Sequence, residues 1–94
     1  MKAIVSVIGK DKPGIIAGVS GVLYKLQINI EDITQTIMQK YFTMIMTVEL
    51  EDCDLDFKEI AGELSALGAS LGVEVRIQLQ SIFDSMHAVS YKAY

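Results

Sequence analysis

The short stretch from Gly9 to Ile16, GKDKPGII, places two lysines, an aspartate, a proline and a glycine between a strand-like run and a helix-like run. A turn accounts for its residues, because Pro13 suits a first helical turn, Asp11 can cap a backbone N–H and Gly14 permits a tight bend. The same corner exposes a helix N-terminus, where free N–H groups and the helix dipole favour a carboxylate.

The side chains of this corner also suit a ligand with both a carboxylate and an ammonium group. Gly14 leaves the backbone open to a ligand, and Lys10 and Lys12 raise the local positive potential. Asp11 can accept a hydrogen bond from an ammonium group. An amino acid carries both groups. Any helix N-terminus has some of these features, so the turn and the binding site both stand as interpretations of these residues.

The residues on either side of the corner predict a strand and a helix. Residues 2–9, KAIVSVIG, are apolar and rich in β-branched side chains, which favours a central strand buried on both faces. From Gly14 to about Leu26 the apolar residues follow a helical period. They are Ile15, Val19, Val22 and Leu26, flanked by Ile16 and Leu23.

Two alternating stretches follow, over residues 28–39 and 41–50. Their period of two predicts a pair of strands, with a hairpin turn at Gln39–Lys40. The phase of the first stretch slips at Glu31–Asp32, as a β-bulge would produce.

The remaining chain predicts a second helix and a fourth strand. Asp54 or Asp56 can cap the helix, and Asp56 with Glu59 has the spacing of a capping box. Its buried stripe consists of Phe57, Ile60, Ala61, Leu64, Leu67 and Leu71, and Gly72 ends it. Residues 73–80 alternate strictly. A short helical turn over residues 81–89 follows, with Ser81 as its cap, and residues 91–94 form a frayed tail.

The predicted order is β-α-β-β-α-β, and one helix layer must cover one face of the sheet because the third and fourth strands are polar on the other. This predicts an α+β, ferredoxin-like βαββαβ fold, with a four-stranded antiparallel sheet and two helices on one face. The whole of residues 1–90 forms one domain.

Composition excludes several functions. The 94 residues carry a net charge of −4 with no basic stripe, which argues against nucleic-acid binding. One cysteine, Cys53, permits neither an internal disulfide nor a multi-cysteine zinc site and fits a reduced, cytoplasmic setting. No stretch reaches membrane-spanning length, so we expect no membrane partner. The apolar content of 51% makes dimerisation a natural way to bury excess apolar surface.

Residues for catalysis are sparse. His87, near Asp84, is the only histidine, and such a helical pair is more often a surface contact than a catalytic dyad. Cys53 is flanked by acids, and a negative environment makes a thiol a poor nucleophile. The acidic stretch EDCDLD lacks the spaced ligands and central glycine of a Ca²⁺ loop. We therefore expect no enzyme activity, no metal and no cofactor.

Other ferredoxin-like functions need residues that the chain lacks. A copper chaperone needs Cys-x-x-Cys in the first loop, and an RNA-binding version needs aromatic residues on its central strands. An acylphosphatase-like enzyme needs an arginine in the first loop, but the only arginine is Arg76.

Three glycines line one side of the first predicted helix together with Lys25. Gly14, Gly18 and Gly21 each lower helix stability if they lie inside it, by about 0.5–1 kcal/mol relative to alanine. Close packing against the second helix is one explanation. Close approach of a partner subunit or a ligand is the other.

At GKDKPGIIAGVSGVLYKLQINIEDI the sequence resembles the ACT domain, a small regulatory βαββαβ module of amino-acid metabolism. Residues Asp11 to Ile15, then Leu26, Asn29 and Ile30, match the family pattern, and the predicted topology covers nearly the whole chain. The chain looks most like the bacterial proteins that consist of a single ACT domain.

The resemblance implies that an effector binds where the corner of one subunit faces the start of the second strand of a neighbour. The implied ligand-binding residues are Asp11, Lys12, Gly14, Ile15 and Asn29. Family members that bind an amino acid often have an amide at the position of Asp11 and a histidine at that of Gly9. The resemblance further implies subunit pairing through the first helix and second strand, with Gly18, Gly21, Ile30 and Ile33 at the interface.

The function expected from the sequence is a non-enzymatic, cytoplasmic, homodimeric regulatory domain. It senses an amino acid or a related small carboxylate by an allosteric population shift and signals to a separate partner protein. The alternative is a ligand-free dimerisation or protein-interaction module with a vestigial effector site.

Overall fold

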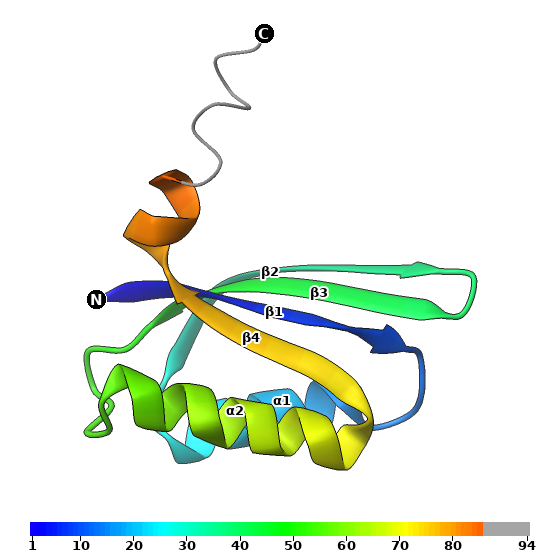
Figure 1. The fold of residues 1–94 in the computed structure, drawn as a ribbon, viewed down its shortest axis with the longest axis horizontal. Coiled ribbons are helices and arrows are strands. Elements are labelled where there is room, and N and C mark those ends of the chain that lie inside the picture. The colour runs from blue at the N-terminus through cyan, green and yellow to red at the C-terminus, as the bar shows by residue number, and fades with distance from the viewer. Residues whose placement is uncertain (86–94) are drawn as a thin grey trace, which may run out of the picture.

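The computed structural model describes residues 1–85 (Figure 1). The predictions for His87, for the second half of the helical turn at residues 81–89 and for the tail at residues 91–94 therefore lie outside the described residues, as does the end of the domain predicted at residue 90. The elements, in chain order, are β1 (Lys2–Lys10), α1 (Ile15–Lys25), β2 (Asn29–Met38), β3 (Tyr41–Glu49), α2 (Phe57–Leu71) and β4 (Val73–Leu79). This order confirms the ferredoxin-like fold.

The strands form one antiparallel sheet in the order β2-β3-β1-β4, and both helices lie on the same face of it (Figure 1). The core lies between the sheet and this helix layer. It is built from alternate strand residues and the inner stripes of α1 and α2, including Val5, Val7, Val19, Leu23, Phe42 and Leu64. The opposite face of the sheet, here termed the open face, carries no helix layer within residues 1–79.

The prediction that β1 is buried on both faces was wrong. β1 is central, as predicted, and Val5 and Val7 are fully buried on its helix side. On the open face, however, Ile8 keeps 53% of its surface exposed. A mostly apolar strand usually indicates cover on both sides, but α1 and α2 both lie on the same face of this sheet.

The β2–β3 hairpin confirms the predicted turn at Gln39–Lys40 and the predicted bulge, which lies between Ile30 and Asp32. Gln39 adopts a positive φ of 58°, which a tight turn tolerates. Because the bulge adds one residue, Ile30 and Ile33 both lie on the helix side of the sheet, paired with Val48 and Met46.

The ends of α2 also match the prediction. Asp56 is the N-cap, and its carboxylate accepts a hydrogen bond from Glu59 N at 2.8 Å to complete a capping box. Of the two candidate caps, Asp54 is therefore excluded. Gly72 ends the helix with a left-handed φ of 73°.

The helix after β4 differs from the prediction, because residue 80 is already helical and Ser81 therefore cannot be its N-cap. The described part, residues 80–85, lies on the open-face side of the sheet (Figure 1). Among residues 1–85 there is no helix whose length and apolarity would allow it to cross a membrane.

Candidate functional site

The corner between β1 and α1 presents an uncapped helix N-terminus. Gly14 is the N-cap of α1, with φ +90°, and its carbonyl accepts a hydrogen bond from Gly18 N at 2.9 Å. No side chain caps this helix, and a Cβ on Gly14 would have no atom within 4 Å. The left-handed backbone explains the glycine, and the open space leaves the first-turn N–H groups accessible.

Asp11 does not cap α1, which corrects the turn interpretation of this residue. Its backbone N–H instead donates to the carbonyl of Lys40 at 2.7 Å, which ties the corner to the turn of the β2–β3 hairpin. Pro13 precedes the helix, since α1 begins at Ile15. The Asp11 side chain is exposed, whereas Ile15 is buried at 2% exposure.

Lys12 lies against the second helix. Its Nζ is 3.2 Å from the position that a Cβ on Gly72 would occupy, at the C-terminus of α2. The last turn of α2 contains no basic residue of its own. Lys12 therefore supplies a positive charge at the negative end of that helix dipole, a role separate from any ligand.

Gly9, at the position where the resemblance leads one to expect a histidine in a domain that binds an amino acid, is closely packed. A Cβ there would lie 2.7 Å from Cγ1 of Val73, its neighbour across β1 and β4. A side chain larger than hydrogen therefore requires Val73 to move.

Asn29 lies at the other end of the sheet. The strand register places Lys10 and Met38 at one end, next to Tyr41, and Lys2 and Asn29 at the other, next to Glu49. At about 3.3 Å per residue, the length of β1 separates these ends by about 26 Å. One subunit therefore cannot bring Asp11 and Asn29 to the same small molecule.

Asn29 lines its own small recess of about 220 Å³, together with Tyr24, Gln27, Ile28 and Asp52. Gln27 adopts a positive φ of 61° in the connection between α1 and β2. The recess is thus at the end of α1 that is opposite to the corner.

The predicted interface glycines on α1 have different surroundings. A Cβ on Gly18 would lie 2.9 Å from Cδ1 of Leu71, so packing against α2 explains this glycine within the chain. Gly21 is exposed and has open space around its Cβ position. Ile30 is partly buried against the core, and Ile33 is 46% exposed on the edge strand β2.

The sequence did not predict the exposed side of α1 that lies opposite Gly18. Ile15, Val19 and Leu23 are buried against the sheet, and Gly18 faces α2. At helical angles, Ile16, Ser20 and Tyr24 then lie on the side toward β2. Ile16 and Tyr24 are 43% and 79% exposed. Their spacing of eight residues was visible in the sequence, but only the position of α2 identifies their side.

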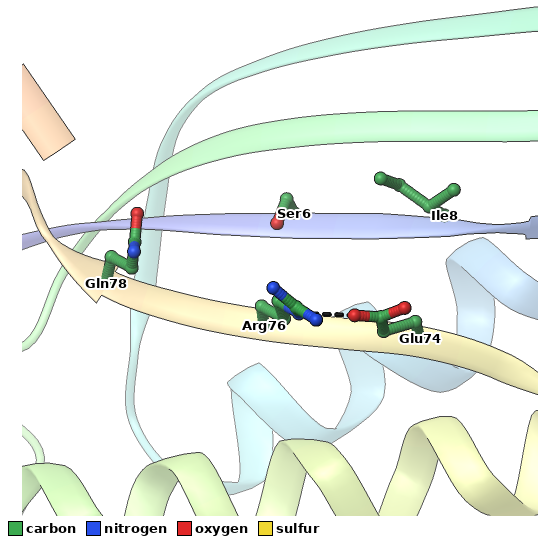
Figure 2. Close-up of a pocket in the computed structure, with 5 residues that line it drawn as sticks. All are labelled: Ser6, Ile8, Glu74, Arg76 and Gln78. Atoms are coloured by element: carbon green, nitrogen blue, oxygen red, sulfur yellow. Dashed lines mark ion pairs between the residues drawn. The ribbon is translucent and has the colours of Figure 1, made fainter. Parts of the chain in front are cut away.

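The open face contains a shallow hollow over β1 and β4 that the sequence did not predict. Its volume is about 360 Å³, and Ser6, Ile8, Glu74, Arg76 and Gln78 line it (Figure 2). Arg76 and Glu74 form an ion pair along β4 (Figure 2). Within residues 1–85 no three histidine, cysteine or acidic side chains gather as a metal would require.

Comparison with known proteins identifies relatives over nearly the whole chain. The family model described as the ACT domain matches residues 2–78. The UPF0237 protein of Clostridium acetobutylicum is 55% identical over 89 residues, which cover 95% of this chain and 100% of that protein.

Solved structures with a similar fold support the same family assignment. The ACT domain protein from Streptococcus pneumoniae is 48% identical, with a TM-score of 0.79 over 89% of this chain and 94% of that one. The ligand-free regulatory subunit of aspartate kinase from Thermus thermophilus is 26% identical, with a TM-score of 0.64 over 82% of this chain and 50% of that one.

Proposed function

This chain belongs to the ACT domain family, whose members are regulatory, small-molecule-binding domains, and we propose that it senses an amino acid or a related small carboxylate between two subunits. The main support for the proposal is the N-terminus of α1 at the β1–α1 corner, which has no side-chain cap and has open space beside Gly14. The exposed N–H groups can donate hydrogen bonds to the carboxylate of the ligand. The Asp11 carboxylate can accept hydrogen bonds from the ammonium group of the ligand.

The separation of Asp11 and Asn29 supports a site shared by two subunits. β2 is an edge strand of ten residues, and its outer edge is unpaired within the described chain. If β2 pairs antiparallel with β2 of a second copy, Asn29 of that copy lies beside Met38 of the first. Met38 is next to the β1–α1 corner, because the Asp11 N–H donates a hydrogen bond to Lys40 in the adjoining hairpin turn. Each dimer then contains two such sites.

The exposed apolar side chains favour the same pairing. Ile33 and Ile37 are 46% and 51% exposed on the helix side of β2, and Ile16 is 43% exposed on the adjoining flank of α1. A ten-residue edge strand that exposes apolar side chains is an open pairing site unless another chain covers it. We infer that the dimer interface consists of β2 and the Ile16–Tyr24 flank of α1, with Gly21 at its border and Gly18 inside the subunit.

A separate partner protein would read the state of the dimer. The Thermus thermophilus structure to which this chain is similar is named as a regulatory subunit, which supports regulation of a second polypeptide. Ligand bound across the interface favours one arrangement of the two subunits, and a partner with higher affinity for that arrangement responds.

The first test is a thermal-shift screen of the full chain against the twenty amino acids and common small carboxylates. A ligand that binds the folded dimer raises the melting temperature in a concentration-dependent way. Asp11→Ala and Asn29→Ala should each abolish the shift, while Asp54→Ala, an exposed aspartate outside the site, should retain it. If no compound shifts the melting temperature of a folded dimer, the alternative of a ligand-free interaction module is favoured.

A mixing experiment tests whether the site is shared. Dimers of Asp11→Ala and dimers of Asn29→Ala should both fail to bind the compound found in the screen. After subunit exchange, a heterodimer has one corner with Asp11 facing an intact Asn29, so calorimetry should recover binding at one site per heterodimer. No recovery in verified heterodimers would contradict a shared site.

A further inference from the structure

The recess beside Asn29 carries two polar side chains that have no partner within the described chain. Tyr24, Gln27, Ile28, Asn29 and Asp52 line its volume of about 220 Å³. Among residues 1–85, no hydrogen bond or ion pair engages the Asn29 amide or the Asp52 carboxylate. Clefts that enclose a whole drug-sized ligand measure about 300–1,000 Å³, so this recess has room for one side chain of a ligand and not for all of it.

The surroundings of the recess favour a positive charge. It lies at the C-terminal end of α1, where the helix dipole favours a cation. The basic residue of this last turn, Lys25, comes two helical turns after Gly18 and therefore lies on the side of α1 toward α2. The Asp52 carboxylate adds a negative charge to the recess, and the ring of Tyr24, which is 79% exposed, can add a cation–π contact.

The dimer proposed above brings this recess beside the β1–α1 corner of the other subunit. Antiparallel pairing of two β2 strands places Asn29 of one subunit beside Met38 of the other, next to that corner. The same two-fold axis runs the two α1 helices antiparallel, with their Ile16–Tyr24 flanks toward each other. The uncapped N-terminus of one α1 then lies near the recess at the C-terminus of the other. A ligand between them meets the positive end of one helix dipole and the negative end of the other.

The two lysines of the β1–α1 corner lie against other parts of the molecule. Lys12 is at the C-terminus of α2. Lys10 shares the open face of β1 with Ile8, because residues two apart in a strand lie on the same face. A contact between Lys40, in the hairpin turn, and Asp52 of the other subunit is the competing explanation for the charge in the recess.

We propose that Asp52 selects an effector with a second cationic group, so that the ligand of the shared site is a basic amino acid. This selectivity rests on the proposed function, since it assigns a ligand class to the same site. The carboxylate of the ligand binds the N-terminus of α1, and its two cationic groups bind Asp11 of the same subunit and Asp52 of the other. The charges are then complementary, with one helix N-terminus for the anionic group and one carboxylate for each cationic group.

Calorimetry on the full chain with matched ligands tests this selection. Lysine and norleucine differ by the side-chain ammonium group, while ornithine and arginine vary the length of the side chain and the kind of cation. At least one basic amino acid should bind wild type about tenfold or more tightly than norleucine, as expected for a hydrogen bond between charged groups. Asp52→Asn should remove this preference. Asp54→Asn, at an exposed position outside the recess, should preserve it.

The other outcomes separate the selectivity from the proposed function. If a neutral or acidic compound binds and no basic amino acid binds more tightly, or if Asp52→Asn keeps the wild-type preference, the shared site stands and the role of Asp52 is overturned. If Asp52→Asn and Lys40→Gln each lower the molar mass in sedimentation while circular dichroism shows folded chains, Asp52 pairs with Lys40 between subunits and its role in selection is again overturned. If no compound binds a folded dimer, the proposed function fails and the selectivity fails with it.

Discussion

A Cβ placed on Gly9 would lie 2.7 Å from Cγ1 of Val73 and 3.1 Å from its Cα. Both residues belong to strands that face each other in the register of β1 and β4. The backbone of Val73 cannot move without shifting the start of β4, directly after the C-cap Gly72. The glycine at this position therefore allows β1 and the start of β4 to approach closely, and a larger side chain would have to displace Val73.

Gly9→Ala should lower the free energy of unfolding by about 1–3 kcal/mol, the usual cost of overpacking a closely packed site. Gly62→Ala is the matched control, because Gly62 is exposed in α2 with open space at its Cβ position. There alanine should stabilise the helix by about 0.5–1 kcal/mol. Urea unfolding measures both changes, and equal stability of the two variants would contradict the packing argument.

Gly14→Ala should destabilise the protein for a different reason. The Cβ has free space, but φ at +90° is unfavourable for an L-residue, at a cost of about 1–2 kcal/mol. Asparagine tolerates left-handed backbone better, so Gly14→Asn should lose less stability than Gly14→Ala. Chemical denaturation measures the free energy of unfolding of the two variants. A lower stability for Gly14→Asn than for Gly14→Ala would indicate that side-chain space, and not the backbone angle, limits the choice of residue at this corner.

Lys12→Gln should lower the stability of the fold by about 0.3–1 kcal/mol, because it removes the positive charge at the C-terminus of α2. The loss should shrink in high salt, since salt screens an exposed charge. Lys58→Gln, in the first turn of α2, is the control and should not destabilise, because a cation is unfavourable at that end. A loss for Lys12→Gln that appears only with ligand present would instead assign Lys12 to the effector site.

The features that the sequence predicted correctly depend on interactions between residues that are close together in the chain. The capping box of Asp56 and Glu59, the stop at Gly72 and the bulge beside Asp32 depend on residues within a few positions of one another, and each was predicted. The βαββαβ order follows from such local signals, together with the rule that one helix layer covers one face of the sheet.

The features that sequence did not predict depend on how distant elements meet. Gly18 and Ile16 lie two residues apart, yet only the position of α2 shows that one faces Leu71 and the other faces away. The approach of Lys12 to Gly72 spans 60 residues of chain. Asp11 and Asn29 match one family pattern in sequence but lie at opposite ends of the sheet, because α1 takes the chain from one end of β1 to the other before β2 begins.

The ion pair between the α-amino group of Met1 and Glu49 Oε2, at 2.7 Å, should make stability depend on pH. The hydrogen bond from this amino group is the main cause that lowers the pKa of Glu49 below its ordinary value of 4.5. A carboxylate with a lowered folded-state pKa stabilises the fold above its unfolded pKa, and this contribution disappears as pH falls through the folded pKa. Glu49→Gln should therefore be less stable than wild type at pH 7, with a difference that shrinks as the pH is lowered below about 4.5. Urea unfolding between pH 7 and pH 3 measures this, with Glu63→Gln on the exposed side of α2 as control, and a difference independent of pH would exclude the ion pair as its source.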